Sequence, residues 1–190
     1  MGDTEKPQFE FGSRSFRIIV ELNRSISSVL LVLRRIFETH RRRDEDKSGS
    51  NHEAIIRADE YFLLCASAKV LRWLDIAVKE NLVPDDLKKD FAAIERPLKD
   101  ARDMREHSED YNLGKGKFPE RFIHEDEISG YKVPADWTFV HKDRYLIGGR
   151  VELSELAIAV RKLFKSLQSS DLWFLPWSDL GLDEYGPLPD

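Results

Sequence analysis

The sequence is poor in cysteine, which excludes several kinds of stabilising or reactive site. Cys65 is the single cysteine among 190 residues, so no disulfide framework can form within the chain, and a zinc site built from cysteines lacks its ligands. The residues around it, "YFLLCASAKVL", are mostly apolar. We therefore expect Cys65 to be a thiol in the core.

Long apolar runs are also absent. No stretch approaches the roughly 20 apolar residues that a helix needs to cross a bilayer. The first residues, "MGDTEKPQFEFG", lack the apolar centre of a secretory signal, and Lys6 occupies the position at which a myristoylation signal has Ser or Thr. We expect a cytoplasmic protein with no membrane partner.

Neither sign of charge dominates the sequence. The chain has 30 Lys and Arg against 35 Asp and Glu, a net charge of -5, and 34% charged residues in total. Interspersed charge of this kind is typical of solvated helix faces and excludes a uniformly basic nucleic-acid coat. A local RNA site or a protein partner is not excluded. The length and the 41% hydrophobic content favour one domain with a substantial core.

Four segments carry apolar residues at spacings of three and four, the pattern of core-facing helices. They cover residues 15–40, 52–81, a segment that begins at Pro84, and 153–167. The charged stretch "HRRRDEDKSGSN" predicts an exposed loop after the first helix. Pro97 interrupts the third pattern, so we expect a kink or two abutting helices there.

The remaining segments suggest an insertion and a tail. Between residues 114 and 150 the helical period disappears, and "DWTFVHKDRYLIGGR" predicts a small β-hairpin. The prediction is thus an all-α fold, an up-and-down bundle of four to five helices with this hairpin inserted before the last long helix. Residues 1–14 form an N-terminal tail, 15–170 a single domain, and 171–190 a Trp-rich and Pro-rich tail that docks partly on the bundle or on a partner.

Most familiar chemical motifs are missing. No histidine has Glu three positions before it, as a ferritin-like di-iron site requires, and no Gly-x-Ser-x-Gly elbow occurs. The run "LGKGK" lacks the rest of a phosphate-binding loop. His124 in "IHEDEI" has carboxylate neighbours, but adjacent loop residues favour a solvated acidic loop over a metal site. We expect no cofactor and no bound metal.

The stretch "RDMREH", from Arg102 to His107, resembles a chemical site more than any other part of the chain. A second Arg with His five positions later occurs in "RIFETH", but there the core residues Ile36 and Phe37 lie inside the motif. One interpretation of "RDMREH" is a charged helix end in which residues four apart pair across one turn. These pairs would be Arg102 with Glu106 and Asp103 with His107.

The other interpretation rests on a resemblance to the HEPN superfamily. Its motif is Arg, a polar residue, three variable residues and His, placed late in the third helix of a bundle, and "RDMREH" is similar to it. The resemblance implies a metal-independent endoribonuclease of toxin-antitoxin or defence type, active as a homodimer. Arg102 would neutralise the scissile phosphate, His107 would transfer protons, and Asp103 would orient one of them. The partners implied are an RNA substrate and an antitoxin protein.

Two features of the motif bear on this interpretation. At 100° per residue, Arg102 and His107 point about 140° apart around a regular helix, so one chain cannot aim both at one atom unless the helix unwinds or a second chain contributes. Nearby carboxylates, including Asp103 and Glu106, would also repel an RNA backbone. The alternative function is a non-catalytic helical-bundle module for dimerisation or partner binding.

Overall fold

The protein is mostly helical, with two small antiparallel sheets. The computed structural model describes residues 10–45, 51–126, 128–141 and 144–175. The helices are α1 (Arg14–Glu45), α2 (His52–Lys79), the 3-10 helix η1 (Asp85–Phe91), α3 (Glu95–Glu106), α4 (Ser108–Asn112), α5 (Pro119–Phe122) and α6 (Leu153–Ser169). The strands are β1 (Ile123–Glu125), β2 (Lys132–Pro134), β3 (Thr138–His141), β4 (Arg144–Ile147) and β5 (Val151–Glu152).

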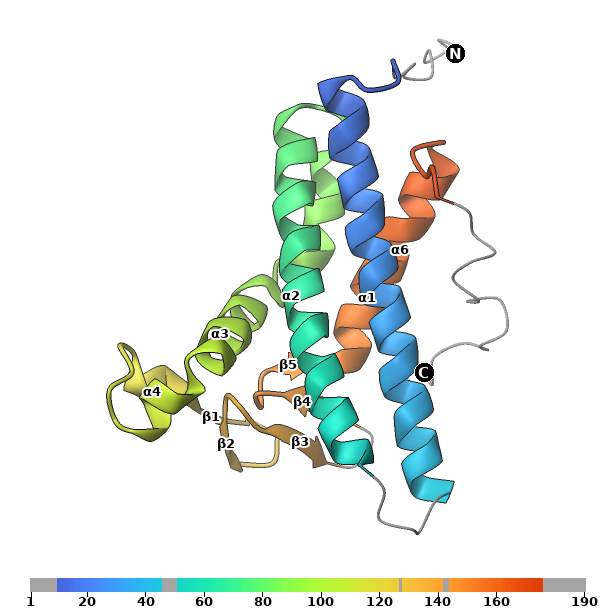
Figure 1. Cartoon of the computed structure of the whole chain (residues 1–190). Coiled ribbons are helices and arrows are strands. Elements are labelled where there is room, and N and C mark those ends of the chain that lie inside the picture. Colours follow the sequence, from blue (N-terminus) through green and yellow to red (C-terminus); the bar gives the residue numbers. More distant parts are fainter. Residues whose placement is uncertain (1–9, 46–50, 127, 142–143, 176–190) are drawn as a thin grey trace.

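The two longest helices, α1 and α2, lie side by side and run in opposite directions, and α6 packs behind them (Figure 1). Their apolar stripes supply most of the core, including Ile19, Leu22, Ile26, Leu63, Val70, Leu74, Leu156, Val160 and Leu163. The three-and-four spacing in the sequence therefore identified the buried faces, and the prediction of a predominantly helical fold is confirmed.

The first helix is longer than predicted. It continues to Glu45, through a stretch for which the sequence analysis predicted a loop. Arginine is a good helix former, and Arg42 and Arg43 lie in the last turn, where positive charge interacts favourably with the helix dipole. The rest of the predicted loop, residues 46–50, lies outside the described residues.

The third helical segment is divided into η1 and α3, as one of the two alternatives for Pro97 predicted. The break lies before the proline. Pro97 occupies the first turn of α3, where a backbone N–H has no partner within the helix, so the proline costs no helical hydrogen bond. Phe91 and Leu98, on either side of the break, are both buried. The break changes the helix direction without removing either side chain from the core.

The predicted hairpin is present. β3 pairs with β4 in an antiparallel register that joins Thr138 to Ile147 and His141 to Arg144, and β5 adds a third strand. A second sheet of β1 and β2 was not predicted, because these strands have only three residues each. Gly149 lies against it with φ +69°, where a Cβ atom would approach the Cβ of Val133 to 2.7 Å. Only glycine allows this close approach.

The beginning of the C-terminal tail docks on the bundle. Asn23 of α1 donates a hydrogen bond to the carbonyl of Leu172 (3.1 Å) and accepts one from the backbone N–H of Phe174 (2.8 Å). The Trp173 ring packs edge-on against Phe164 of α6. The prediction that part of the tail docks on the bundle is confirmed for these residues, whereas Trp177 lies outside the described part of the chain.

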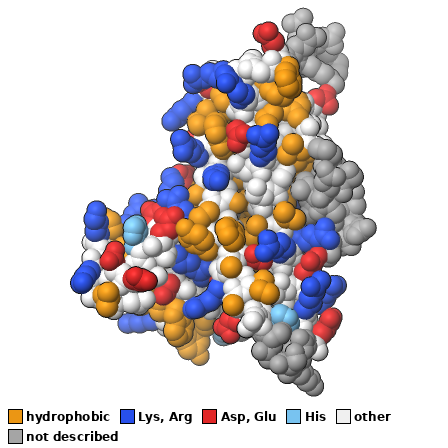
Figure 2. Space-filling model, in the orientation of Figure 1, with side chains coloured by type: hydrophobic (Ala, Val, Ile, Leu, Met, Phe, Trp, Pro, Cys, Tyr) orange, Lys and Arg blue, Asp and Glu red, His pale blue; other side chains and the backbone are white. Residues whose placement is uncertain are grey.

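Both signs of charge are interspersed over the face visible in Figure 2. Among the helices that the structure describes, none is long and apolar enough to cross a membrane.

Candidate functional site

The predicted motif lies where α3 ends. The helix stops at Glu106, and His107 has the non-helical angles φ −115° and ψ 26° before α4 begins at Ser108. The side chain of His107 is 65% exposed. Because the backbone leaves the helix at this residue, the direction of the histidine is no longer fixed by the regular helical repeat.

Arg102 is held by its neighbour Asp103. The Oδ1 atom of Asp103 accepts hydrogen bonds from Nε (3.0 Å) and Nη2 (2.5 Å) of Arg102. Burial opposes the charged form of the guanidinium, but the bond to Asp103 and the nearby Glu106 carboxylate outweigh it, and the net result is a raised pKa of Arg102. Asp103 thus positions Arg102 and neutralises part of its charge.

The side chains of the motif do not form the pairs expected for residues four apart. Arg102 pairs with Asp103, and Glu106 accepts a hydrogen bond from the Tyr61 hydroxyl of α2 (3.2 Å). The Nδ1 atom of His107 lies 3.9 Å from Oδ2 of Asp110. The interpretation of the motif as i, i+4 pairs within one helix was therefore wrong in its choice of partners, because α3 ends before His107 and Tyr61 contacts Glu106.

Cys65 lies beside this group rather than in the core. It is partly buried, and its thiol, together with burial and Glu106, raises the pKa of Tyr61 to about 12. The expectation of a core thiol was wrong because Cys65 lies at the edge of the apolar stripe of α2, near Arg102.

His107 opens into a pocket of about 380 Å³, here called the α3 pocket. Its other lining side chains include carboxylates, cations and aromatic rings, among them Asp110, Tyr111, Lys115, Lys117, Phe118 and Arg121. The Tyr111 ring stacks on Phe122 at 4.9 Å between centroids, and the Arg121 guanidinium lies 5.0 Å from the centre of the Phe118 ring. Asp103 lines the pocket, but Arg102 of the same chain does not.

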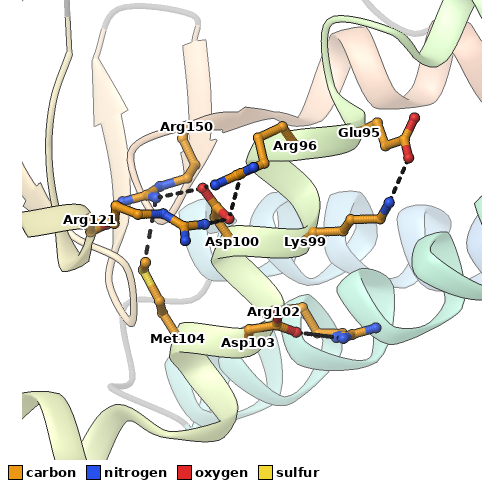
Figure 3. A network of polar contacts seen from close by, with 9 residues as sticks. All are labelled: Glu95, Arg96, Lys99, Asp100, Arg102, Asp103, Met104, Arg121 and Arg150. Atoms are coloured by element: carbon orange, nitrogen blue, oxygen red, sulfur yellow. Dashed lines mark hydrogen bonds and ion pairs between the residues drawn. The ribbon is translucent and has the colours of Figure 1, made fainter. Parts of the chain in front are cut away.

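Three arginines surround Asp100 (Figure 3), a residue that lines this pocket. Asp100 accepts hydrogen bonds from Arg96 and Arg121, and its Oδ2 lies 3.9 Å from Nη1 of Arg150. Burial and the charge of Arg121 lower the pKa of Arg150. Three guanidinium groups around one carboxylate leave an excess of positive charge.

The carboxylates near the motif are thus less repulsive to an anion than the sequence suggested. Asp100 and Asp103, which line the α3 pocket, are already paired with arginines. Asp110 is a third carboxylate of the pocket wall, and Lys115, Lys117 and Arg121 are its cations. The formal charges of these six lining residues balance, and Arg96 and Arg150 beside Asp100 add positive charge next to the pocket, which is compatible with a phosphate group.

A second polar centre was missed by the sequence analysis. The side chain of Glu60 is 1% exposed and forms an ion pair with Arg105 (2.8 Å). It also accepts hydrogen bonds from the hydroxyls of Thr138 (2.6 Å) and Tyr145. Burial, followed by the charge of Glu60, raises the pKa of Tyr145. The signal was present, because Glu60 stands four positions after Ile56 and three before Leu63, on the apolar stripe of α2.

This centre lines a pocket of about 330 Å³, here called the Glu60 pocket. The ring of His40 contacts Tyr145 edge-on at 4.8 Å between centroids and also lines the pocket. The two residues of the second Arg-to-His match, Arg35 and His40, have different surroundings. His40 lines this pocket, whereas Arg35 forms an ion pair with the buried Asp59 (2.7 Å). The structure therefore does not bring Arg35 and His40 together in one site.

Among the described residues, no three His, Cys, Asp or Glu side chains are grouped so that they could hold a metal ion. His124 lies in β1, paired with Val133 of β2. No protein-family model matches the chain, and no curated protein or solved structure is significantly similar to it. The function must therefore be inferred from the residues and their geometry.

Proposed function

We propose that the protein is a HEPN-like, metal-independent endoribonuclease of toxin-antitoxin or defence type, built on an up-and-down bundle of four to five helices. The observation that carries the proposal is the position of His107. It is exposed at the end of α3, in a pocket that also contains Lys115, Lys117 and Arg121. A histidine beside cations and aromatic rings combines proton transfer, phosphate binding and base stacking.

The proposed reaction is an internal transesterification of RNA. The 2'-hydroxyl oxygen forms a bond to phosphorus, and the bond between phosphorus and the 5'-oxygen breaks, which leaves a 2',3'-cyclic phosphate. His107 accepts the proton of the 2'-hydroxyl or donates one to the leaving oxygen. Arg102 binds the phosphate and stabilises its developing charge, since a guanidinium presents paired donors to two oxygens. Asp103 acts through Arg102 and is a positioning residue.

The proposal requires a homodimer. Arg102 does not line the pocket of its own His107, so an active site that uses both needs Arg102 of one copy and His107 of another. A two-fold dimer that brings the ends of two α3 helices together supplies both combinations at once. This is the arrangement that the family resemblance implies.

The experiment is an RNA cleavage assay in EDTA with four variants. Arg102→Ala and His107→Ala should each lower the cleavage rate by a factor of about 100 or more, as loss of a proton-transfer or charge-stabilising group does. Asp103→Ala should lower it less, because it acts through Arg102. Arg72→Ala, at an exposed position of α2, is the matched control and should cleave like the parent. Equal cleavage by all four variants and the parent would refute the assigned roles.

A second candidate function is a non-catalytic helical-bundle module for dimerisation or partner binding. The observation that favours it is the exposure of large apolar side chains on and around the sheets: Ile128 is 66%, Tyr131 58% and Val140 55% exposed. Clustered exposed apolar residues are typical of interaction surfaces. Light scattering of the parent and of Val140→Ser tests it, and an unchanged association state would count against this surface in self-association.

A further inference from the structure

The Glu60 pocket has the size and the chemistry of a ligand site separate from the α3 pocket. It lies between the C-terminal end of α1, the first turns of α2, and strands β3 and β4. Its volume of about 330 Å³ lies within the usual range of small-molecule pockets, roughly 300–1,000 Å³. Such pockets combine aromatic walls with a few fixed polar groups.

The polar wall of this pocket is fixed by a buried network. Glu60 accepts hydrogen bonds from Thr138 and Tyr145, and Arg105 balances its charge. Because these side chains hold one another, they are already in place before a ligand arrives, which lowers the entropic cost of binding. Arg105 itself is not part of the lining.

The rest of the lining includes an indole ring and two guanidinium groups. Trp137 lines the pocket and is 58% exposed, so its indole is accessible to a ligand. Arg43 and Arg57 line the same pocket, together with the carboxylates of Glu53 and Glu60. The charge of Glu60 is balanced by Arg105, so two guanidinium groups and the carboxylate of Glu53 are the other charged groups of the wall.

We propose that the Glu60 pocket binds a nucleoside phosphate, with the base stacked on Trp137 and the phosphate held by Arg57 and Arg43. An indole ring stacks on any nucleobase, and guanidinium groups bind phosphate oxygens with paired hydrogen bonds. Thr138 and Tyr145 border the same space, and because both donate their hydroxyl hydrogens to Glu60, their oxygens accept hydrogen bonds from an amino group of a base or from a ribose hydroxyl. The ligand is either a free mononucleotide or one nucleotide of an RNA strand.

The test is calorimetric titration of the full-length protein with AMP, GMP, CMP and UMP, and with a short single-stranded RNA. Trp137→Ala and Arg57→Ala should each weaken binding about tenfold or more, since the first removes a base-stacking contact and the second a charge-assisted contact to the phosphate. Saturable binding of a mononucleotide identifies the free ligand. Binding of the RNA alone, with the same loss in both variants, identifies a nucleotide within a strand.

Matched controls separate the pocket from general surface effects. Tyr131 has the same 58% exposure as Trp137 but does not line the pocket, and Arg72 is an exposed arginine of the same helix as Arg57. Tyr131→Ala and Arg72→Ala should bind like the parent. Neither control alters the α3 pocket, and binding of a mononucleotide is measured without RNA cleavage, so the proposal stands or fails independently of the proposed nuclease activity.

Three results would overturn the proposal. The first is that neither the mononucleotides nor the RNA binds saturably. The second is binding that Trp137→Ala and Arg57→Ala leave unchanged while both remain folded by circular dichroism. The third is that inorganic phosphate binds as tightly as the nucleotides, which would leave no role for the aromatic ring.

Discussion

Arg102 and His107, five positions apart at the end of α3, face different surroundings. Arg102 turns back to Asp103 and lies near Cys65 of α2, whereas His107 opens into the α3 pocket. The regular helix would separate the two side chains by about 140°. The end of α3 at Glu106 does not bring them into one pocket of one chain, so the proposed nuclease needs a second copy of the chain to combine them.

A mixing experiment tests whether the active site is shared. Arg102→Ala and His107→Ala are each expected to be inactive in RNA cleavage. A mixed dimer holds one complete site, with Arg102 from one copy and His107 from the other. Because random exchange makes half of the dimers mixed, the mixture should regain about one quarter of the parent activity. No recovery after exchange, with dimers verified by light scattering, would exclude a shared site.

Arg105, inside the predicted motif, is expected to be more important for stability than Arg102. Arg105→Ala leaves Glu60 buried without its cation, which should lower the free energy of unfolding by about 3–5 kcal/mol. Arg102→Ala, which removes a partly exposed pair, should change it by less than about 1 kcal/mol. Urea unfolding measures both, and a loss below about 1 kcal/mol for Arg105→Ala would contradict the importance of the pair.

Asp59 should make the protein less stable as the pH rises from acid toward neutral. Burial raises the pKa of Asp59 above its ordinary 3.8, and Arg35 only partly opposes this. Between 3.8 and the raised pKa the folded chain binds more protons than the unfolded one, so stability falls with pH, by up to about 1.4 kcal/mol per pH unit. The Asp59→Asn variant should lack this dependence.

Asp126 is the matched control, because its pKa is shifted in the opposite direction from that of Asp59. Hydrogen bonds from Ser129 and the charge of Arg144 lower the pKa of Asp126 below 3.8. Its contribution to stability is therefore present above pH 3.8, the ordinary pKa of Asp, and is lost as the pH falls through the lowered pKa. Urea unfolding at several pH values compares Asp59→Asn and Asp126→Asn with the parent. The same pH trend for both differences would contradict these assignments.

The sequence predicted the helices well because helical spacing records burial directly. The last helix begins at Leu153 as predicted, and its apolar stripe is buried. The sequence did not predict β1 and β2, since strands of three residues carry too short a pattern. It also missed the extension of α1 to Glu45, because the loop composition of residues 40–51 obscured the helix-forming arginines.

The candidate site was predicted only in part. The sequence placed "RDMREH" at the end of the third helical segment, where it lies. It could not show that Arg102 bonds to its neighbour Asp103 or that Arg105 turns inward to Glu60, because the spacing of residues does not tell which of several carboxylates an arginine contacts. The tertiary partners of charged residues leave little trace in local spacing.

The measurement that tests the proposed nuclease activity most directly is incubation of the purified protein in EDTA with labelled RNA and, separately, with the same strand 2'-O-methylated throughout. If the 2'-hydroxyl is the nucleophile and no metal is required, the RNA is cut and its fragments end in 2',3'-cyclic phosphates, while the methylated strand stays intact. RNA of several sequences that remains uncut, or equal cleavage of the methylated strand, would contradict a metal-independent endoribonuclease in which His107 and Arg102 act on the ribose and its phosphate.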